Sequence, residues 1–528
     1  MSESVSILIW GLSLAGIIFL TFITRYWLRA LLIRKPYTAD SLIHLRFVRE
    51  VRRRGWKRAR REMRRDYPLG YHWILSFLPE SWMLKWERFN GGLFDSLHML
   101  LFVAVFAAFA PKGTPPVYIY FWAPLLLAIS PGWMYAGMGP RAYHLTERVL
   151  AELLIGAAFS GLWLFTSTGN WAWFAAAAVI AGFAVTASKF SAQVLVGFCP
   201  IIGILQHSVP IFLFPLATFA VAMVQSSGDY WTLLKGQTEY SLWYAAAIKR
   251  KEMMVWTRNS LEGAMKRYRE FGAKGVLKWL VEECSFFSTP LHHVPFLIAV
   301  LAAWKGLGHL PTDTFPRDWL IAGFAIWFLT SLKWFLVLGE AERYPFHAAI
   351  AEYFFIGFWL ASGVPPIWKW VFLGYSVVWY AAQQGIILIR LRHNKGESLV
   401  QEREQLMEFL NTLPKQRYMA FSKSHALTGE VMFFTDHLHP EIEIYDGKQL
   451  TYEDIFSVFP YPKWSMIDEL GIGILVVNQP EMKAALKLGI GNDYDFGSME
   501  RLFVTETYAV YSVPNGKAEE TALRTAAS

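Results

Sequence analysis

Residues 149–187 of the 528-residue chain read VLAELLIGAAFSGLWLF-TSTGN-WAWFAAAAVIAGFAVTA, two long apolar segments separated by a short polar joint. An apolar segment of about 20 residues can cross the hydrocarbon core of a bilayer as a helix. A joint this short leaves no room for a folded domain between the two segments. The pattern therefore predicts two consecutive membrane-spanning helices.

Segments of the same kind recur along the chain, at 5–28, 93–110, 117–133, 149–165, 171–187, 190–207, 210–224, 291–307, 319–338, 348–362 and 367–391. They predict a polytopic α-helical membrane protein with about eleven transmembrane helices. The composition agrees, because only 17% of the residues are charged, whereas a soluble domain carries about 25%. The segment 5–28 lacks a basic n-region and a small-residue cleavage site, so we expect it to be retained as a helix.

The remaining chain divides into three large non-membrane pieces. We expect residues 1–391 to form a transmembrane domain with a basic first loop at 29–92 and a second large loop at 225–290, and residues 392–528 to form a small soluble α/β domain. In this tail we expect helices at 397–413, 452–459, 463–470 and 481–488, and strands at 430–434, 441–445, 472–477 and 508–513. The tail has 13 Lys and Arg against 20 Asp and Glu, which predicts a solvated acidic surface.

The orientation in the membrane follows less directly from the sequence. With eleven spans, the first loop, the second large loop and the tail all fall on the same side. Between Arg29 and Arg88 there are 16 Lys and Arg against 6 Asp and Glu, which by the positive-inside rule favours the cytoplasm. That rule weakens for loops longer than about 60 residues, so charge favours the cytoplasmic side only weakly.

The first candidate site lies just after the first apolar segment. Asp40 and His44 are four residues apart and therefore share one face of a helix. A carboxylate with an adjacent His and with Arg46 nearby can act as a general base or as a metal ligand. The alternative is an amphipathic helix at the membrane surface, with Leu42, Leu45 and Phe47 in the lipid.

Three more polar clusters border the predicted spans. The basic run 49–65 either grips phosphate or attracts anionic lipid non-specifically. The segment 139–148 carries Arg141 and Glu147, and Glu152 follows inside the next span with Arg148 as its expected partner. The fourth cluster is 339–344, which reads GEAERY. By the parity of the spans all four clusters lie on one face, whereas helix caps alone would fall on both.

These residues resemble motifs of the GT-C superfamily of integral-membrane glycosyltransferases, which use lipid-phosphate-linked sugar donors. Asp40-Ser41 and His44-Leu45-Arg46 look like the acidic first-loop motif of the oligosaccharyltransferase catalytic subunit and its relatives, and Tyr67-Pro68-Leu69-Gly70 follows at a similar place. The cluster from Arg141 to Glu147 stands where the family has its second acidic motif. The segment 340–344 resembles a late-helix Arg-Tyr element, and the tail line GIGILVV at 471–477 resembles exported C-terminal domains of the family.

The resemblance implies a membrane glycosyltransferase of GT-C type, on the mannosyltransferase or oligosaccharyltransferase plan, that moves a sugar from a polyprenyl-phosphate donor to an acceptor. Asp40 would be catalytic with His44 beside it, and the donor phosphate would contact Arg46, Arg141, Arg343 and Tyr344. If a metal is used, it would be Mg²⁺ or Mn²⁺ on Asp40 and Glu147. The tail lacks the Trp-Trp-Asp run of oligosaccharyltransferases, so peptide glycosylation is not expected.

The resemblance also implies that the first loop and the C-terminal domain face outward from the membrane, against the charge count. With only two cysteines and no targeting motif, the chain suits a plasma (inner) membrane. The expected partners are a lipid-linked sugar donor and membrane lipids, and not nucleic acid, although the net charge is +8. Two alternatives stay open at this point. One is a transporter or flippase for lipid-linked intermediates, and the other is a non-catalytic membrane assembly subunit.

Overall fold

The computed structural model describes residues 3–31, 39–63, 67–130, 145–249, 258–305, 314–339, 341–361, 365, 367–393, 397–422, 425–440, 467, 470–487, 496, 497 and 499–513. These residues fall into two compact units. The first unit comprises residues 1–33, 66–71 and 85–389. The second unit comprises 34–65, 72–84 and 390–528, so the first loop contributes to both units.

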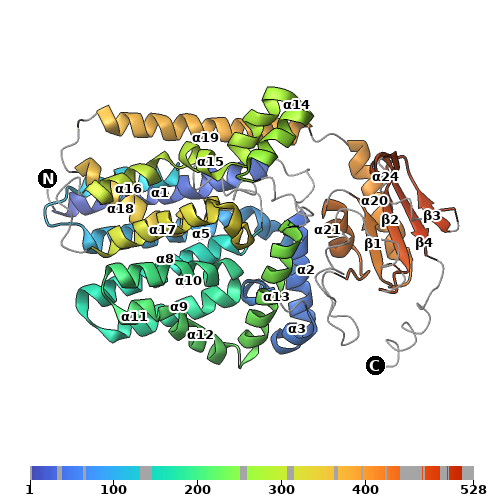
Figure 1. Cartoon of the computed structure of the whole chain (residues 1–528), viewed down its shortest axis with the longest axis horizontal. Helices are drawn as coiled ribbons and strands as arrows, with labels where there is room; N and C mark the ends of the chain where they lie inside the picture. Colours follow the sequence, from blue (N-terminus) through green and yellow to red (C-terminus); the bar gives the residue numbers. More distant parts are fainter. Residues whose placement is uncertain are drawn as a thin grey trace. The chain divides into compact units, whose positions relative to one another are not determined.

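The first unit is helical throughout its described part (Figure 1). Two of its helices, α4 and α5, begin in the first loop and are shared with the second unit. The elements are α1 (Glu3–Leu31), α4 (Gly70–Leu75), α5 (Glu80–Phe109), η1 (Tyr118–Trp122), α6 (Ala123–Ala128), α8 (Arg148–Thr168), α9 (Trp171–Ala187), α10 (Lys189–Leu205), α11 (Val209–Phe212), α12 (Phe214–Gln225), α13 (Asp229–Lys249), α14 (Leu261–Glu282), α15 (Ser285–His292), α16 (Val294–Lys305), α17 (Phe315–Ser331), η3 (Lys333–Leu338), η4 (Ala341–Arg343), η5 (Pro345–Ala348), α18 (Ala349–Ala361) and α19 (Ile367–His393). Every apolar segment predicted as a span carries helix.

Three described helices are long and apolar enough to cross a membrane, namely Leu8–Tyr26 of α1, then α5 and α8. Several others are apolar but shorter, including α9, α10 and α12. The structure therefore supports a polytopic helical architecture without establishing the predicted number of eleven spans. Two of the predicted spans are interrupted in the structure. The segment 210–224 is broken between α11 and α12, and the segment 319–338 passes from α17 into a 3₁₀-helix.

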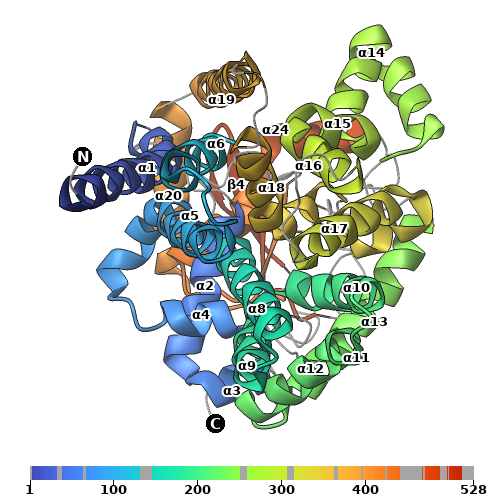
Figure 2. The ribbon, with the colours of Figure 1, turned by 90° about the vertical axis from the view of Figure 1, so that its left-hand side faces the viewer.

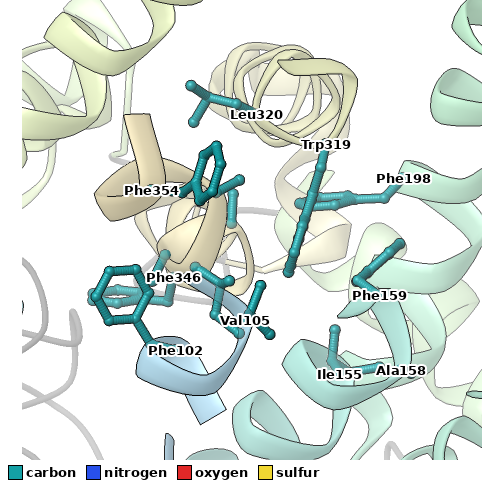
Figure 3. Packing of buried hydrophobic residues seen from close by; sticks show 14 of the residues in the cluster. Phe102, Val105, Ile155, Ala158, Phe159, Phe198, Trp319, Leu320, Phe346 and Phe354 are labelled. Atoms are coloured by element: carbon teal, nitrogen blue, oxygen red, sulfur yellow. The ribbon is translucent and has the colours of Figure 1, made fainter. Parts of the chain in front are cut away.

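The core of the first unit forms where small and aromatic side chains alternate. Along α9, Ala177, Ala181 and Ala184 are fully buried on one face, so α8 and α9 approach closely, as small residues allow in membrane helices. Figure 2 views these helices end-on. Figure 3 shows Trp319 of α17 beside Phe159 of α8, and their ring centroids are 5.1 Å apart. The Phe159 ring also lies 5.9 Å from the ring of Phe198, so this aromatic core packs α8, α10 and α17 together.

The second unit combines first-loop helices with a small α/β fold. Its further elements are α2 (Ala39–Arg54), α3 (Trp56–Glu62), α20 (Glu397–Thr412), β1 (Tyr418–Phe421), α21 (His425–Phe434), β2 (Ile474–Asn478), α24 (Gln479–Lys487), β3 (Glu500–Val504) and β4 (Tyr508–Ser512). The sheet order is β1-β2-β4-β3. Strands β1 and β2 are parallel, and β4 is antiparallel to both of its neighbours. Buried apolar side chains of β1, β2 and β4 form the core of the sheet.

The structure corrects one element of the tail and adds two. The helix predicted at 397–413, the strands at 472–477 and 508–513 and the helix at 481–488 are present within two residues. The predicted strand at 430–434 is wrong, because these residues belong to helix α21. Strands β1 and β3 were not predicted. The predicted elements at 441–445, 452–459 and most of 463–470 lie outside the described residues.

Candidate functional site

Two arginines and a carboxylate meet around one aromatic ring in the first unit. The Cζ atom of Arg343 lies 4.9 Å from the centroid of the Phe190 ring. The Cζ atom of Arg148 lies 5.9 Å from the same centroid. Glu152 and His347 line the same small cavity and are both buried. We call this cluster the Phe190 site. Its volume of about 10 Å³ holds at most one water molecule.

Four elements bring these side chains together. Arg148 is the first residue of α8, and Glu152 lies one turn further on the same helix. Phe190 is in the first turn of α10. Arg343 ends η4, and His347 belongs to η5, which leads directly into α18. The site therefore joins the third and fourth polar clusters of the sequence, as expected if both border one face of the bundle.

Tyr344 fixes the backbone next to Arg343. Its hydroxyl donates to the carbonyl oxygen of Leu338 at 3.0 Å, and its ring centroid lies 6.0 Å from that of Phe190. Burial raises the pKa of Tyr344, so the hydroxyl stays a proton donor at neutral pH. On the other side, Glu342 forms an ion pair with Arg258 at 3.0 Å. The predicted residues Arg343 and Tyr344 are thus both at the site. Arg343 lines the cavity, and Tyr344 packs next to the Phe190 ring.

The other predicted residues of the third cluster are placed only in part. Arg141 lies outside the described residues. Glu147 is 8% exposed and precedes α8, where the hydroxyl of Thr146 donates to its carboxylate at 3.4 Å. Nearby, the hydroxyl of Tyr71 donates to Asn90 Oδ1 at 2.6 Å, and Asn90 Nδ2 donates to the carbonyl oxygen of Thr146 at 3.2 Å. This chain of hydrogen bonds connects the motif at 67–70 to the start of α8.

The first-loop motif lies on α2, in the second unit. Asp40 is in the first turn of the helix, and its side chain lies outside the described residues. His44 Nδ1 lies 2.9 Å from His72 Nε2. The two rings are stacked with centroids 5.1 Å apart, and both residues are buried. His72 therefore fixes the orientation of the His44 ring, a partner that the sequence did not suggest.

Arg46 is 4% exposed and already holds protein partners. It forms an ion pair with Glu50 at 3.1 Å and donates to the carbonyl oxygen of Thr435 at 3.2 Å. Burial lowers the pKa of Arg46, although Glu50 opposes the shift. Burial would raise the pKa of Glu50, but Arg46 and Arg54 together lower it. A phosphate at Arg46 would have to compete with Glu50, so the role predicted for Arg46 stays a prediction.

The packing of α2 bears on the lipid-facing alternative for this segment. Leu42, Leu45 and Phe47 are at most 1% exposed, and α2 packs along α21 of the same unit. These side chains are therefore buried in protein, and the interpretation that places them in lipid is wrong. The polar side of the helix is also occupied, because Arg49 and Arg52 both pair with Glu80 at 2.6 Å.

Three buried ionisable groups lie outside the four polar clusters of the sequence. Arg25 and Asp95 form an ion pair at 3.0 Å with both side chains fully buried. Glu352 of α18 is 3% exposed. Each lies inside a predicted span, where a charged side chain is rare and marks a functional or structural site by default. That rule would have found all three from the sequence.

A comparison with protein-family models finds no match, and neither does a comparison with curated protein sequences. Among solved structures, the chain is similar to the crystal structure of ArnT from Cupriavidus metallidurans bound to undecaprenyl phosphate. The TM-score is 0.50 at 11% identity, and the alignment covers 97% of this chain and 98% of that one.

A second similar structure is the archaeal oligosaccharyltransferase AglB from Archaeoglobus fulgidus, in complex with an inhibitory peptide and a dolichol-phosphate. Its TM-score is 0.47 at 12% identity, covering 90% of this chain and 70% of that one. ArnT aligns along nearly the whole length of both chains, so this chain has a fold distantly similar to that of ArnT.

Proposed function

We propose that this protein is a membrane glycosyltransferase that moves a sugar from a polyprenyl-phosphate donor to an acceptor on the exported face of a plasma (inner) membrane. The observation that carries the proposal is the meeting of Arg148, Arg343 and Glu152 at the Phe190 site, in a chain whose fold resembles that of ArnT. ArnT was solved with undecaprenyl phosphate bound, and the donor class is carried over from it.

The Phe190 site has the chemistry that a phosphate needs. Two guanidinium groups beside one ring offer planar pairs of donors, which match phosphate oxygens better than an ammonium does. When the bond to the sugar breaks, negative charge grows on the phosphate, and fixed cations there stabilise the leaving group. The cavity is nearly filled by side chains, so the headgroup would enter by moving Arg343 or Arg148. Arg141 and Arg46 remain predicted further contacts.

In the proposed reaction Asp40 removes the proton of the acceptor hydroxyl, which attacks the anomeric carbon of the donor sugar. His44, held by His72, orients Asp40 or the acceptor. The predicted Mg²⁺ or Mn²⁺ site on Asp40 and Glu147 stays a prediction. Among the described residues, no three His, Cys, Asp or Glu side chains stand close enough together to hold a metal ion, and we derive no step through one.

The test uses the full chain reconstituted in lipid nanodiscs. Binding of undecaprenyl phosphate would be measured first, followed by release of undecaprenyl phosphate from a panel of undecaprenyl-phosphate sugars. Arg343→Ala should weaken binding at least about tenfold, the cost of one charge-assisted contact of about 1.5 kcal/mol. Asp40→Asn should bind normally and transfer nothing. Arg501→Ala, on exposed β3 of the tail, is the matched control and should change neither.

Three outcomes would overturn parts of the proposal. Transfer by Asp40→Asn at the wild-type rate would remove Asp40 from catalysis. Tight binding of undecaprenyl phosphate that depends on Arg343, with no sugar released from any donor, would favour the transporter or flippase alternative. If Arg343→Ala binds as tightly as the wild type, the Phe190 site is not the phosphate site.

A further inference from the structure

The second large loop contains a helical hairpin. Helix α14 is interrupted at Gly272, where φ is 61° and ψ is −149°, so it consists of two arms, 261–271 and 273–282. The arms pack against each other, because a Cβ atom added at Gly275 would overlap the carbonyl oxygen of Arg267. We call residues 261–282 the α14 hairpin.

The base of the hairpin is tied firmly to the helical bundle. The backbone N–H of Asn259 donates to the backbone carbonyl oxygen of Glu283 at 3.2 Å, which holds the two ends of the hairpin together. The Asn259 side chain donates to Ser285 Oγ at 2.8 Å and accepts from the Ser285 amide at 2.6 Å. Arg258, just before it, pairs with Glu342 next to the Phe190 site. The hairpin therefore has a fixed direction relative to α15 and η4.

The outer face of the first arm is apolar. Leu261, Met265, Tyr268 and Phe271 follow at intervals of three or four residues, so they share one helical face. They are 83%, 57%, 61% and 62% exposed. Four large apolar side chains in one exposed row are unusual for a surface in water and mark a contact with lipid or protein. A soluble helix would turn this face towards the core.

The surroundings of the hairpin favour lipid. Figures 1 and 2 both show α14 at the periphery of the first unit, beyond α15. The apolar surface continues into α15, where Phe286 is 40% exposed and lies 5.8 Å from the ring of Phe328, itself 45% exposed on α17. The hairpin also has five Lys and Arg against three Asp and Glu, as is typical of helices that lie in the headgroup region.

We propose that the α14 hairpin lies in the membrane surface, with Leu261, Met265, Tyr268 and Phe271 among the upper acyl chains and its charged residues among the headgroups. Through Arg258 and Glu342 the membrane then sets the position of η4. This inference is independent of the chemistry proposed above, because it depends only on where the hairpin lies.

The experiment measures the depth of single spin labels in the full chain, in nanodiscs of phosphatidylcholine with and without phosphatidylglycerol. Cys199 and Cys284, both buried, are first replaced by Ala. Met265→Cys reports on the apolar face, and Lys266→Cys, the next residue and about 100° away on the helix, is the matched control. Each nitroxide is exposed to oxygen, which enters lipid, and to a nickel chelate, which stays in water.

For the label at 265 we expect collisions with oxygen to exceed those with nickel several-fold relative to the label at 266. The preference should hold in both lipid mixtures. If both labels meet nickel equally, the apolar face is in water and the proposal fails. If the label at 265 meets neither reagent, a protein covers the face, and the proposal fails in favour of a second copy or a partner. Tyr268→Cys and Arg269→Cys repeat the test one turn further along.

Discussion

The fully buried ion pair between Arg25 of α1 and Asp95 of α5 should contribute strongly to the stability of the helical bundle, and this contribution can be measured. Arg25 Nε lies 3.0 Å from Asp95 Oδ2, and both side chains have no exposed surface. Arg25 also donates to Thr24 Oγ1 at 2.7 Å and to the carbonyl oxygen of Ala128. One guanidinium therefore connects α1, α5 and α6.

The size of the effect follows from the distance. Two unit charges 3.0 Å apart attract by about 5 kcal/mol at an effective dielectric constant of roughly 20. The Asp95→Leu substitution removes one charge and leaves the other buried without compensation, which typically costs about 3–5 kcal/mol. The double substitution Arg25→Met with Asp95→Leu removes both charges of this pair. We expect it to recover most of that loss.

The assay is reversible unfolding of the full chain from detergent micelles by SDS, followed by helical circular dichroism. Asp95→Leu should lower the free energy of unfolding by about 3–5 kcal/mol, and the double variant by much less. Glu80→Gln, at a half-exposed ion pair with Arg49, is the control and should cost under about 1 kcal/mol. A loss below about 1 kcal/mol for Asp95→Leu would refute the reasoning, as would a double variant equal to the sum of its single substitutions.

Two further predictions concern the tail and the first-loop motif. Burial raises the pKa of Glu430 from 4.5 to about 7, against the pull of Arg403. The folded tail therefore binds this proton more tightly than the unfolded chain does. The contribution of Glu430 to stability is fully present below pH 4.5 and falls by up to about 3 kcal/mol as the pH rises from 4.5 through 7. Glu430→Gln should flatten this dependence, measured by amide hydrogen exchange of α21 between pH 5 and 8. An unchanged slope would remove Glu430 as its cause. Gly70→Ala should lower the free energy of unfolding in the SDS assay by about 1–3 kcal/mol, because its Cβ would lie 2.8 Å from the backbone oxygen of Thr186. A loss within error would show that α4 can move away.

How far the sequence predicts this fold depends on the length of each apolar segment. The segment 149–165 is long and apolar, and the structure places α8 at 148–168. The segment 430–434 is only five residues long, and a short apolar run cannot be assigned to helix or strand from its pattern. It is helical because Leu427 and Val431 are four residues apart and both buried, and because the whole of α21 packs along α2. That packing depends on residues about 390 positions away.

The candidate site likewise contains residues that the sequence predicts and residues that it does not. Arg148 is predicted because charges at the border of a span are costly unless they serve something, and Arg343 because the segment 340–344 resembles an Arg-Tyr element of the GT-C superfamily. Phe190 and His347 carry no such signal, since an aromatic residue or a lone His at the end of an apolar helix is ordinary. They join the site only because α10 and η5 pack beside α8. The first-loop motif shows the same limit, since the His72 partner of His44 is 28 residues away in the chain.

The distribution of ion pairs argues against finding a phosphate site by counting charges. The basic run of the first loop is the densest positive stretch in the sequence, yet five of its described arginines pair with Glu50, Glu62 or Glu80. Each of these carboxylates contacts two or more arginines, so much of the local charge is balanced within the loop. At the Phe190 site two arginines contact one uncharged ring, and the carboxylate of Glu152 lines the same cavity. Each cluster therefore combines arginines with carboxylates. The number of basic residues alone does not distinguish a phosphate site from a salt-bridged surface, so the binding experiment on Arg343→Ala has to decide.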